Sequence, residues 1–396
     1  MTEEAGSARS NLSGFLTGEF LHEHGEETPL LTGDAAFQPH ISSMGNASGY
    51  GAVRPAPTVP MDDASQHVWP EMCTLAKFTV PICATHLLEL SLSVVSVLSL
   101  GHLGTVELAS ASLAGITANV TGFSVISGLV SALDTLLPAS YTRQPHLMGL
   151  WTQRVGLMVF AVLPLIFVLW LNAERGLILL GQDPDIAYNA RQFLMVLSFG
   201  LPGVAIFELC RRFLQAQGMM HAPTVVLIIV SPLNAVANFF LVWGPERYRI
   251  GFLGAPMASA LSMWLMAALC AVQCAVACRD TWGGFSRDVW DPAALRTCVS
   301  LGSAGLISLA SEWWAWEIVG LVTAALGTRA LASQSVLLVL SSVTYQIPFA
   351  AAVAASVRVG NLLGAMHASS ARTASYAAVV LSIVVGVFNS SVVFGT

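Results

Sequence analysis

The chain has 396 residues, of which 55% are hydrophobic and only 10% are charged, whereas a soluble domain carries about 25% charged residues. So few charged side chains cannot cover the surface of an ordinary water-soluble protein of this length, which excludes that class. The net charge of −6 arises in the first 75 residues, where ten acidic side chains face two arginines, and it indicates no nucleic-acid partner.

Residues 1–72 are rich in Gly, Ser, Pro and Glu, which predicts a disordered acidic tail. The tail lacks the cationic start and apolar stretch of a cleaved signal peptide. Its segment Glu26–Leu31 resembles an acidic dileucine sorting motif, although a Glu-rich tail also produces such a match by chance. We therefore expect a vacuolar membrane or the plasma membrane as the destination.

Nine later segments are apolar enough to cross a bilayer, which takes about 20 residues each. They lie at approximately 76–99, 107–137, 148–171, 190–212, 220–243, 252–278, 295–325, 331–358 and 371–394. With the tail inside, nine arginines fall in inward loops and five in outward loops, which favours a cytoplasmic N-terminus. The sequence thus predicts an all-α polytopic membrane protein.

Two stretches 223 positions apart carry the same pattern, because Leu103–Leu113 and Leu326–Val336 are identical at seven of eleven positions. At the same offset Glu89 aligns with Glu312. The offset covers six helices, an even number, so the repeat is parallel. We expect a first lobe over 73–280 and a partial second lobe over 281–396, with about nine of twelve helices present and the C-terminal end truncated.

Motifs in order along 71–396 resemble eukaryotic multidrug and toxic compound extrusion (MATE) transporters, and the long acidic tail resembles fungal members. They are Ser99–Gly104, Glu107–Ala109, Asn119–Gly122, Ala132–Leu136, Gln182–Pro184, Phe213–Gln217, Glu312–Glu317, Gln346–Phe349 and Ser356–Ala365. The resemblance implies a two-lobe bundle around a central cavity and antiport, in which protons or sodium ions enter while organic cations or metabolites leave. The family's last three helices, one of which usually supplies a further acid, are absent here.

The second lobe contains the first candidates for the coupling chemistry. Burial in lipid disfavours the ionised form of a carboxyl group, so an acid at that depth is suited to exchange a proton for a bound cation. Glu312 matches the family acid, and Trp316 lies one turn on, where its ring would stack a cation. Glu317 stands in the same relation to Trp313. Gln334 and Tyr345 complete the expected cavity lining.

Glu89, Asn119 and Asp134 are the candidates in the first lobe. For each acid, a hydrogen bond to a neighbouring helix is the structural alternative, and for Asp134 it is a salt link with Arg143 or Arg154. The sequence also predicts a helix-end salt link of Glu208 with Arg211 and Arg212, at i, i+3 and i+4.

The cysteines Cys270, Cys274 and Cys278 lie at i, i+4 and i+8 on one helix. We interpret them as packing residues on that helix and expect no metal site and no cofactor.

The favoured function is a proton-coupled antiporter for small, cationic molecules, monomeric and not an enzyme. Sodium coupling and a non-transporting truncated fragment are alternatives. An intramembrane acyltransferase fits least, because no histidine has an evident catalytic partner.

Overall fold

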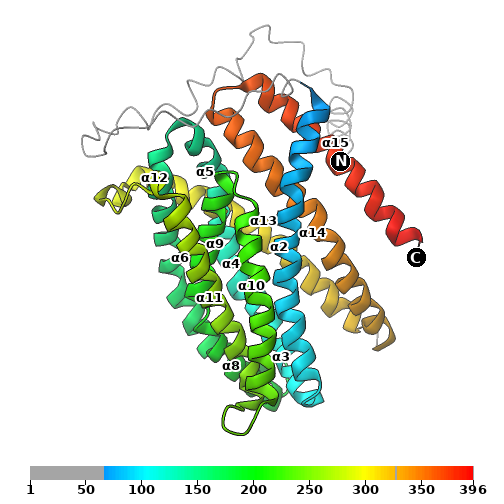
Figure 1. Ribbon diagram of the computed structural model, residues 1–396. Helices are drawn as coiled ribbons and strands as arrows, with labels where there is room; N and C mark the ends of the chain where they lie inside the picture. The colour runs from blue at the N-terminus through cyan, green and yellow to red at the C-terminus, as the bar shows by residue number, and fades with distance from the viewer. Residues whose placement is uncertain (1–66, 326–327, 396) are drawn as a thin grey trace, which may run out of the picture. The chain divides into compact units, whose positions relative to one another are not determined.

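The computed structural model describes residues 67–325 and 328–395, which are helical over nearly their whole length (Figure 1). The helices are α2 (Val68–Gly101), α3 (Thr105–Ala118), the π-helix η3 (Asn119–Phe123), α4 (Ser124–Val130), α5 (Ala132–Arg143), η4 (Pro145–Leu147), α6 (Met148–Leu171), α7 (Ala173–Leu179), α8 (Pro184–Ser198), α9 (Leu201–Ala216), α10 (His221–Asn238), η5 (Phe239–Trp243), η6 (Gly251–Leu253), α11 (Gly254–Ala277), α12 (Arg279–Trp282), η7 (Arg287–Trp290), α13 (Pro292–Ala325), α14 (Thr328–Gly364) and α15 (Ala368–Gly395). The expected tail, with its sorting motif, lies outside the described residues except for 67–72, where α2 begins.

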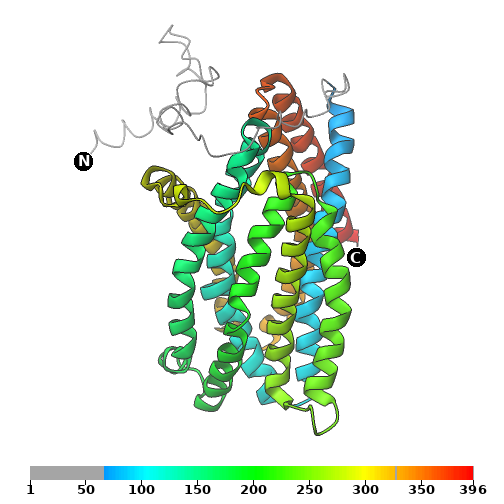
Figure 2. The same ribbon diagram turned by 60° about the vertical axis from the view of Figure 1, so that its left-hand side comes forward.

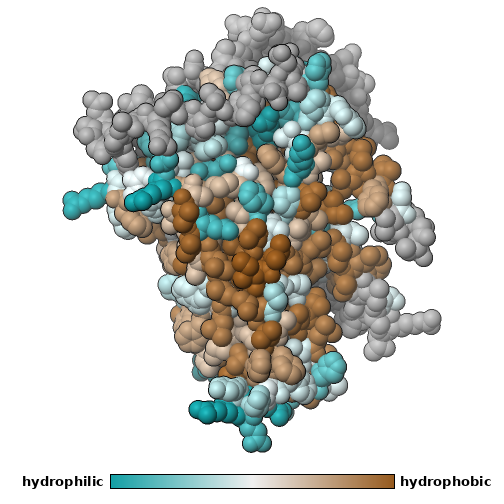
Figure 3. Space-filling view, in the orientation of Figure 1, coloured by the Kyte–Doolittle hydropathy of each residue, from teal (hydrophilic) through white to brown (hydrophobic). Residues whose placement is uncertain are grey.

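Eight of the nine expected membrane spans are confirmed. Among the described residues, eight helices are long and apolar enough to cross a membrane, and the bent pair α8 and α9 passes the same test only when its two helices are taken together as one span. The two members of this pair meet at 51°, next to Pro202 at the start of α9. Figure 3 shows the hydrophobic side chains gathered in a broad band between hydrophilic ends.

The second span is not the single continuous helix that its apolar length predicts. It consists of α3, η3, α4 and α5, with a π-helical turn at η3 and a break at Ser131. The indole Nε1 of Trp170 donates a hydrogen bond to Thr121 Oγ1 at 2.9 Å, and the same ring leaves no room for a side chain at Gly122. A π-helical turn inside a membrane helix is a frequent mark of a functional segment.

The last three helices pack against the first two spans. Helix α13 lies along α4, α14 lies along α5 and α2, and α15 packs on α14 and α2 (Figures 1 and 2). Buried alanines of α14 and α15 contact Leu75 and Ile82 of α2. Small side chains let membrane helices approach closely, so this interface is built for tight packing.

Candidate functional site

A network of five charged side chains joins three membrane-spanning segments. Arg211 Nη1 donates to Glu89 Oε1 at 2.9 Å, and Arg211 Nη2 donates to Glu208 Oε2 at 2.7 Å. Arg212 forms ion pairs with Glu208 at 3.7 Å and with Asp134 at 3.3 Å. Two of the acids predicted as site residues, Glu89 and Asp134, are therefore brought together through arginines that both come from α9.

Local structure explains how these side chains meet. Glu208, Arg211 and Arg212 stand at i, i+3 and i+4 near the end of α9, so all three point from one face of that helix. Asp134 lies in the first turn of α5, directly after the break at Ser131. The predicted salt link within α9 is confirmed. The proposed partners of Asp134 were wrong, because the structure pairs it with Arg212 and not with Arg143 or Arg154.

The reason for that difference lies in the third span. Arg154 is fully buried, donates from Nη2 to the Asp288 carbonyl at 2.8 Å and stacks on the Trp151 ring at 4.8 Å. It therefore holds the connection before α13. Asp134 points instead toward α9, which sequence spacing alone does not reveal.

The charges in the network do not balance. Its members are three carboxyl groups and two guanidinium groups, which leaves one negative charge if every carboxyl is ionised. Side-chain exposure is 6% for Arg211 and 8% for Glu208, against 27% for Glu89 and 30% for Asp134. An uncompensated charge among membrane helices costs free energy, so one added cation or proton stabilises the network. The added charge would enter at Glu89 or Asp134, because these two acids are partly exposed.

His86 extends the network at one edge. Its Nδ1 lies 3.1 Å from Glu89 Oε2, at i, i+3 on α2. The spacing of His86 to Glu89 was the sequence signal that could have singled this histidine out. With His86 protonated, three cationic groups match the three carboxylates.

A second acid lies on α13 among aromatic side chains. Glu312 is half-buried, and the Tyr345 hydroxyl of α14 lies beside it. Trp316 is 46% exposed, and Trp313 is partly buried. The Glu317 side chain lies outside the described residues. Glu312 therefore has a phenol from the next helix beside it, together with an exposed indole one turn away.

Asn119 and Gln334 lie apart from the charged network. Asn119 is exposed at the first position of η3. The next residue, Val120, accepts a hydrogen bond through its carbonyl from Trp314 Nε1 at 3.4 Å. Gln334 is half-buried in α14. The π-helical turn is thus linked to the aromatic segment of α13. Neither the position of Asn119 nor the sequence repeat predicts this contact.

An ion pair between Glu71 and Arg358, called the clasp below, joins α2 to α14 near the start of α2. Arg358 of α14 donates to both carboxylate oxygens of Glu71, at 2.6 and 3.1 Å, and Glu71 is 2% exposed. Beside this pair Thr142 Oγ1 donates to the Asn361 carbonyl at 2.9 Å. Arg358 thereby links the end of α14 to the first span.

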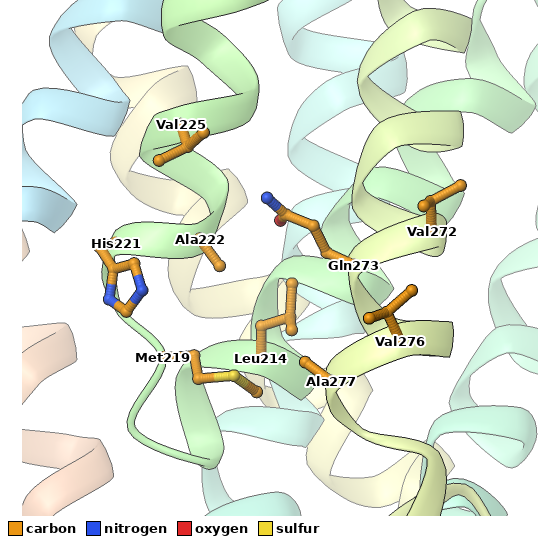
Figure 4. A pocket seen from close by; sticks show the side chains of 9 residues that line it. All are labelled: Leu214, Met219, His221, Ala222, Val225, Val272, Gln273, Val276 and Ala277. Atoms are coloured by element: carbon orange, nitrogen blue, oxygen red, sulfur yellow. The ribbon is translucent and has the colours of Figure 1, made fainter.

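The cysteine stripe packs α11 against α9. Cys270 and Cys278 are buried, and Cys274 Sγ lies 3.7 Å from the Cys210 carbonyl oxygen. A groove of about 340 Å³ opens beside this stripe, where the ends of α9 and α11 meet the start of α10 (Figure 4). Apolar side chains dominate its walls, with His221 and Gln273 as the polar members, and none of the predicted site residues lines it.

Comparison with known proteins decides the family. A family model described as MatE matches residues 81–240 and 306–395, more than half of the chain. The chain belongs to the MATE family. An uncharacterized transporter of Schizosaccharomyces pombe is 39% identical over 86% of this chain and 63% of that protein. Multidrug and toxin extrusion protein 2 of mouse is 35% identical over 76% of this chain and 52% of its own length.

The solved structures agree with this assignment. The crystal structure of the eukaryotic MATE transporter AtDTX14 superposes with a TM-score of 0.74, at 28% identity over 84% of this chain and 74% of that one. A MOP superfamily transporter from Pyrococcus furiosus, at 14% identity and a TM-score of 0.71, shares the fold. The predicted family and MATE-type fold are confirmed. MATE family members are transporters and not enzymes, and this chain spans less than two thirds of the two curated relatives named above.

Proposed function

We propose that this MATE chain exports organic cations in exchange for protons. The observation that carries the proposal is the charge imbalance of the network formed by Glu89, Asp134, Glu208, Arg211 and Arg212. One proton makes this group electrically neutral without rearranging its guanidinium contacts. A sodium ion, the alternative, would need several oxygen ligands that the arginines do not already occupy.

The cation would bind at Glu312. A carboxylate supplies the opposite charge, and an indole face adds about 0.5–2 kcal/mol of cation–π attraction. Trp316 is exposed one helical turn from Glu312, and the Tyr345 hydroxyl of α14 lies beside the carboxylate. Antiport then requires that a proton in the charged network and a cation at Glu312 exclude each other.

The clasp would close one face of the transport path. We propose that the lobes divide near residue 280, as 73–280 and 281–396, so that the Glu71–Arg358 pair joins one lobe to the other. The arginine distribution favours the cytoplasmic side for this end, and we propose a vacuolar or plasma membrane as its location. Transport then requires that the clasp open and re-form in each cycle.

Ethidium exchange in proteoliposomes tests the proposal. Ethidium keeps its charge at every working pH, so trapping by protonation does not contribute. With the membrane potential clamped by potassium and valinomycin, we expect ethidium to accumulate in liposomes with an acidic lumen, and Glu312→Gln to abolish the accumulation. Accumulation driven by a sodium-loaded lumen at equal pH would instead establish sodium coupling. If ethidium accumulates neither with the pH gradient nor with the sodium gradient, the result contradicts transport by this chain.

A further inference from the structure

The two acids that occupy equivalent positions in the repeat are joined by a continuous line of side chains. His86 Nδ1 lies 3.1 Å from Glu89 Oε2, and the His86 ring meets the Phe349 ring edge-on at a centroid distance of 5.1 Å. Phe349 meets the Tyr345 ring at 5.7 Å, and the Tyr345 hydroxyl lies beside Glu312. The line therefore runs from α2 through α14 to α13.

The positions of its members follow from helix geometry. His86 and Glu89 are three residues apart on α2, and Tyr345 and Phe349 are four apart on α14, so each pair shares one face of its helix. The contact between the two pairs depends on the packing of α14 along α2. It forms only where these helices touch.

Duplication alone does not account for this line. At the offset of the repeat, the counterpart of His86 is Leu309, and the counterparts of Tyr345 and Phe349 are Gly122 and Ile126. The second copy thus lacks an imidazole beside its acid. A leucine would fill the space at position 86 without needing a polar partner, so packing does not explain a histidine held against a carboxylate.

We propose that His86 is a positioning residue that couples the charged network to Glu312 through Phe349 and Tyr345. The proposal rests on the proposed antiport and adds the route by which its two halves communicate. The charged and titratable groups along the route are Glu89 on α2, Arg211 and Glu208 on α9, Tyr345 on α14 and Glu312 on α13.

The physical basis is the geometry of ring contacts. When Glu89 changes its partners, His86 moves with it, because the two share a hydrogen bond. Aromatic pairs prefer edge-to-face or offset arrangements, so displacing the His86 ring displaces Phe349 and then Tyr345. The hydroxyl that contacts Glu312 is thereby shifted, which changes how that carboxylate receives a cation.

A double-mutant cycle on ethidium affinity tests the coupling. The dissociation constant is measured by fluorescence on the purified chain for wild type, His86→Gln, Tyr345→Phe and the double variant. Coupled residues deviate from the product of the single effects, and we expect a deviation of about fivefold or more. As a control, Phe193→Leu disrupts the Phe193–Phe252 contact, 5.9 Å between centroids in the first six spans, and should combine with Tyr345→Phe within about twofold of the product.

Variants of Phe349 provide a second test of the coupling, which remains available if His86→Gln fails to fold. Phe349→Tyr keeps a ring between His86 and Tyr345 and should retain the coupling, whereas Phe349→Leu should abolish it. Multiplicative effects for His86 and Tyr345, or equal coupling in the two Phe349 variants, would overturn the inference. If ethidium binding is also insensitive to Glu312→Gln, the proposed function fails with it. If only the coupling is missing, the function stands and the route is wrong.

Discussion

Arg211, which is buried, and Arg212, which is partly buried, hold Glu89, Asp134 and Glu208 in place. Arg211 contacts Glu89 and Glu208, and Arg212 contacts Glu208 and Asp134, so removing either guanidinium exposes two carboxyl groups to each other. Breaking a buried ion pair by deleting one partner costs about 3–5 kcal/mol, because the remaining charge is left uncompensated. Neutralising a carboxyl as well relieves that charge.

We therefore predict that Arg211→Met lowers the stability of the purified protein by about 3–5 kcal/mol, and that adding Glu208→Gln restores part of the loss. Thermal unfolding in detergent measures both effects. The matched control is Glu174→Gln, whose partner Arg191 lies 3.6 Å away at a half-exposed site, and this change should cost at most about 1 kcal/mol. Equal losses in the two single variants would contradict a network that depends on burial.

At the level of the helices, glycine determines how closely the last three helices approach the second span. A side chain at Gly364 would collide with the Thr142 hydroxyl and the Ala139 carbonyl, and one at Gly360 would come within 2.7 Å of Pro138 Cβ. Gly305 of α13 likewise faces Ser131 and the Gly128 carbonyl. These contacts make α5 and α14 a single packed layer beside the clasp.

Gly364→Ala should consequently destabilise the protein by about 1–3 kcal/mol, as overpacking does. Gly386→Ala in α15 is the control, since nothing lies within 4 Å of its added methyl group, and alanine there is neutral or stabilising because it favours helix. Thermal unfolding of the two variants side by side provides the measurement. Equal or higher stability of Gly364→Ala would mean that α14 does not press against α5 as described.

The sequence predicts those features that are determined within one segment, and it does not predict those that depend on contacts between segments. Apolar length is a property of each segment alone, so the membrane spans could be predicted. The π-helical turn could not, because it depends on Trp170 from another span. Similarly, the i, i+3 link of Glu208 and Arg211 was visible, whereas the contact of Arg211 with Glu89, 122 positions away, arises only from packing.

At the scale of the whole molecule, the clasp and the charged network act at different steps of the proposed transport cycle. The Glu71–Arg358 pair holds α2 to α14 in the arrangement described here. Opening this end separates the pair and also loosens the His86–Phe349 contact, because both bridge the same two helices. Release of the clasp and rearrangement around Glu312 are therefore expected to occur together.

Breaking the clasp should expose the buried end of α5. In a background without the seven native cysteines, we expect Glu71→Gln to accelerate maleimide labelling of a Thr142→Cys variant, since Thr142 is only 6% exposed in the closed arrangement. The Glu71→Gln/Arg358→Gln double variant should label more slowly than the single variant, because it leaves no unpaired buried charge. Unchanged labelling in Glu71→Gln would show that the pair does not hold this end closed.

Proton release on cation binding tests the central claim most directly. The purified chain is mixed with ethidium in weakly buffered detergent solution, and the pH change is recorded against the amount of ethidium bound. The account predicts that cation binding displaces protons from the wild-type protein and that Glu312→Gln removes this release. Ethidium binding with no change in bound protons would contradict the claim that cation binding and proton binding exclude each other.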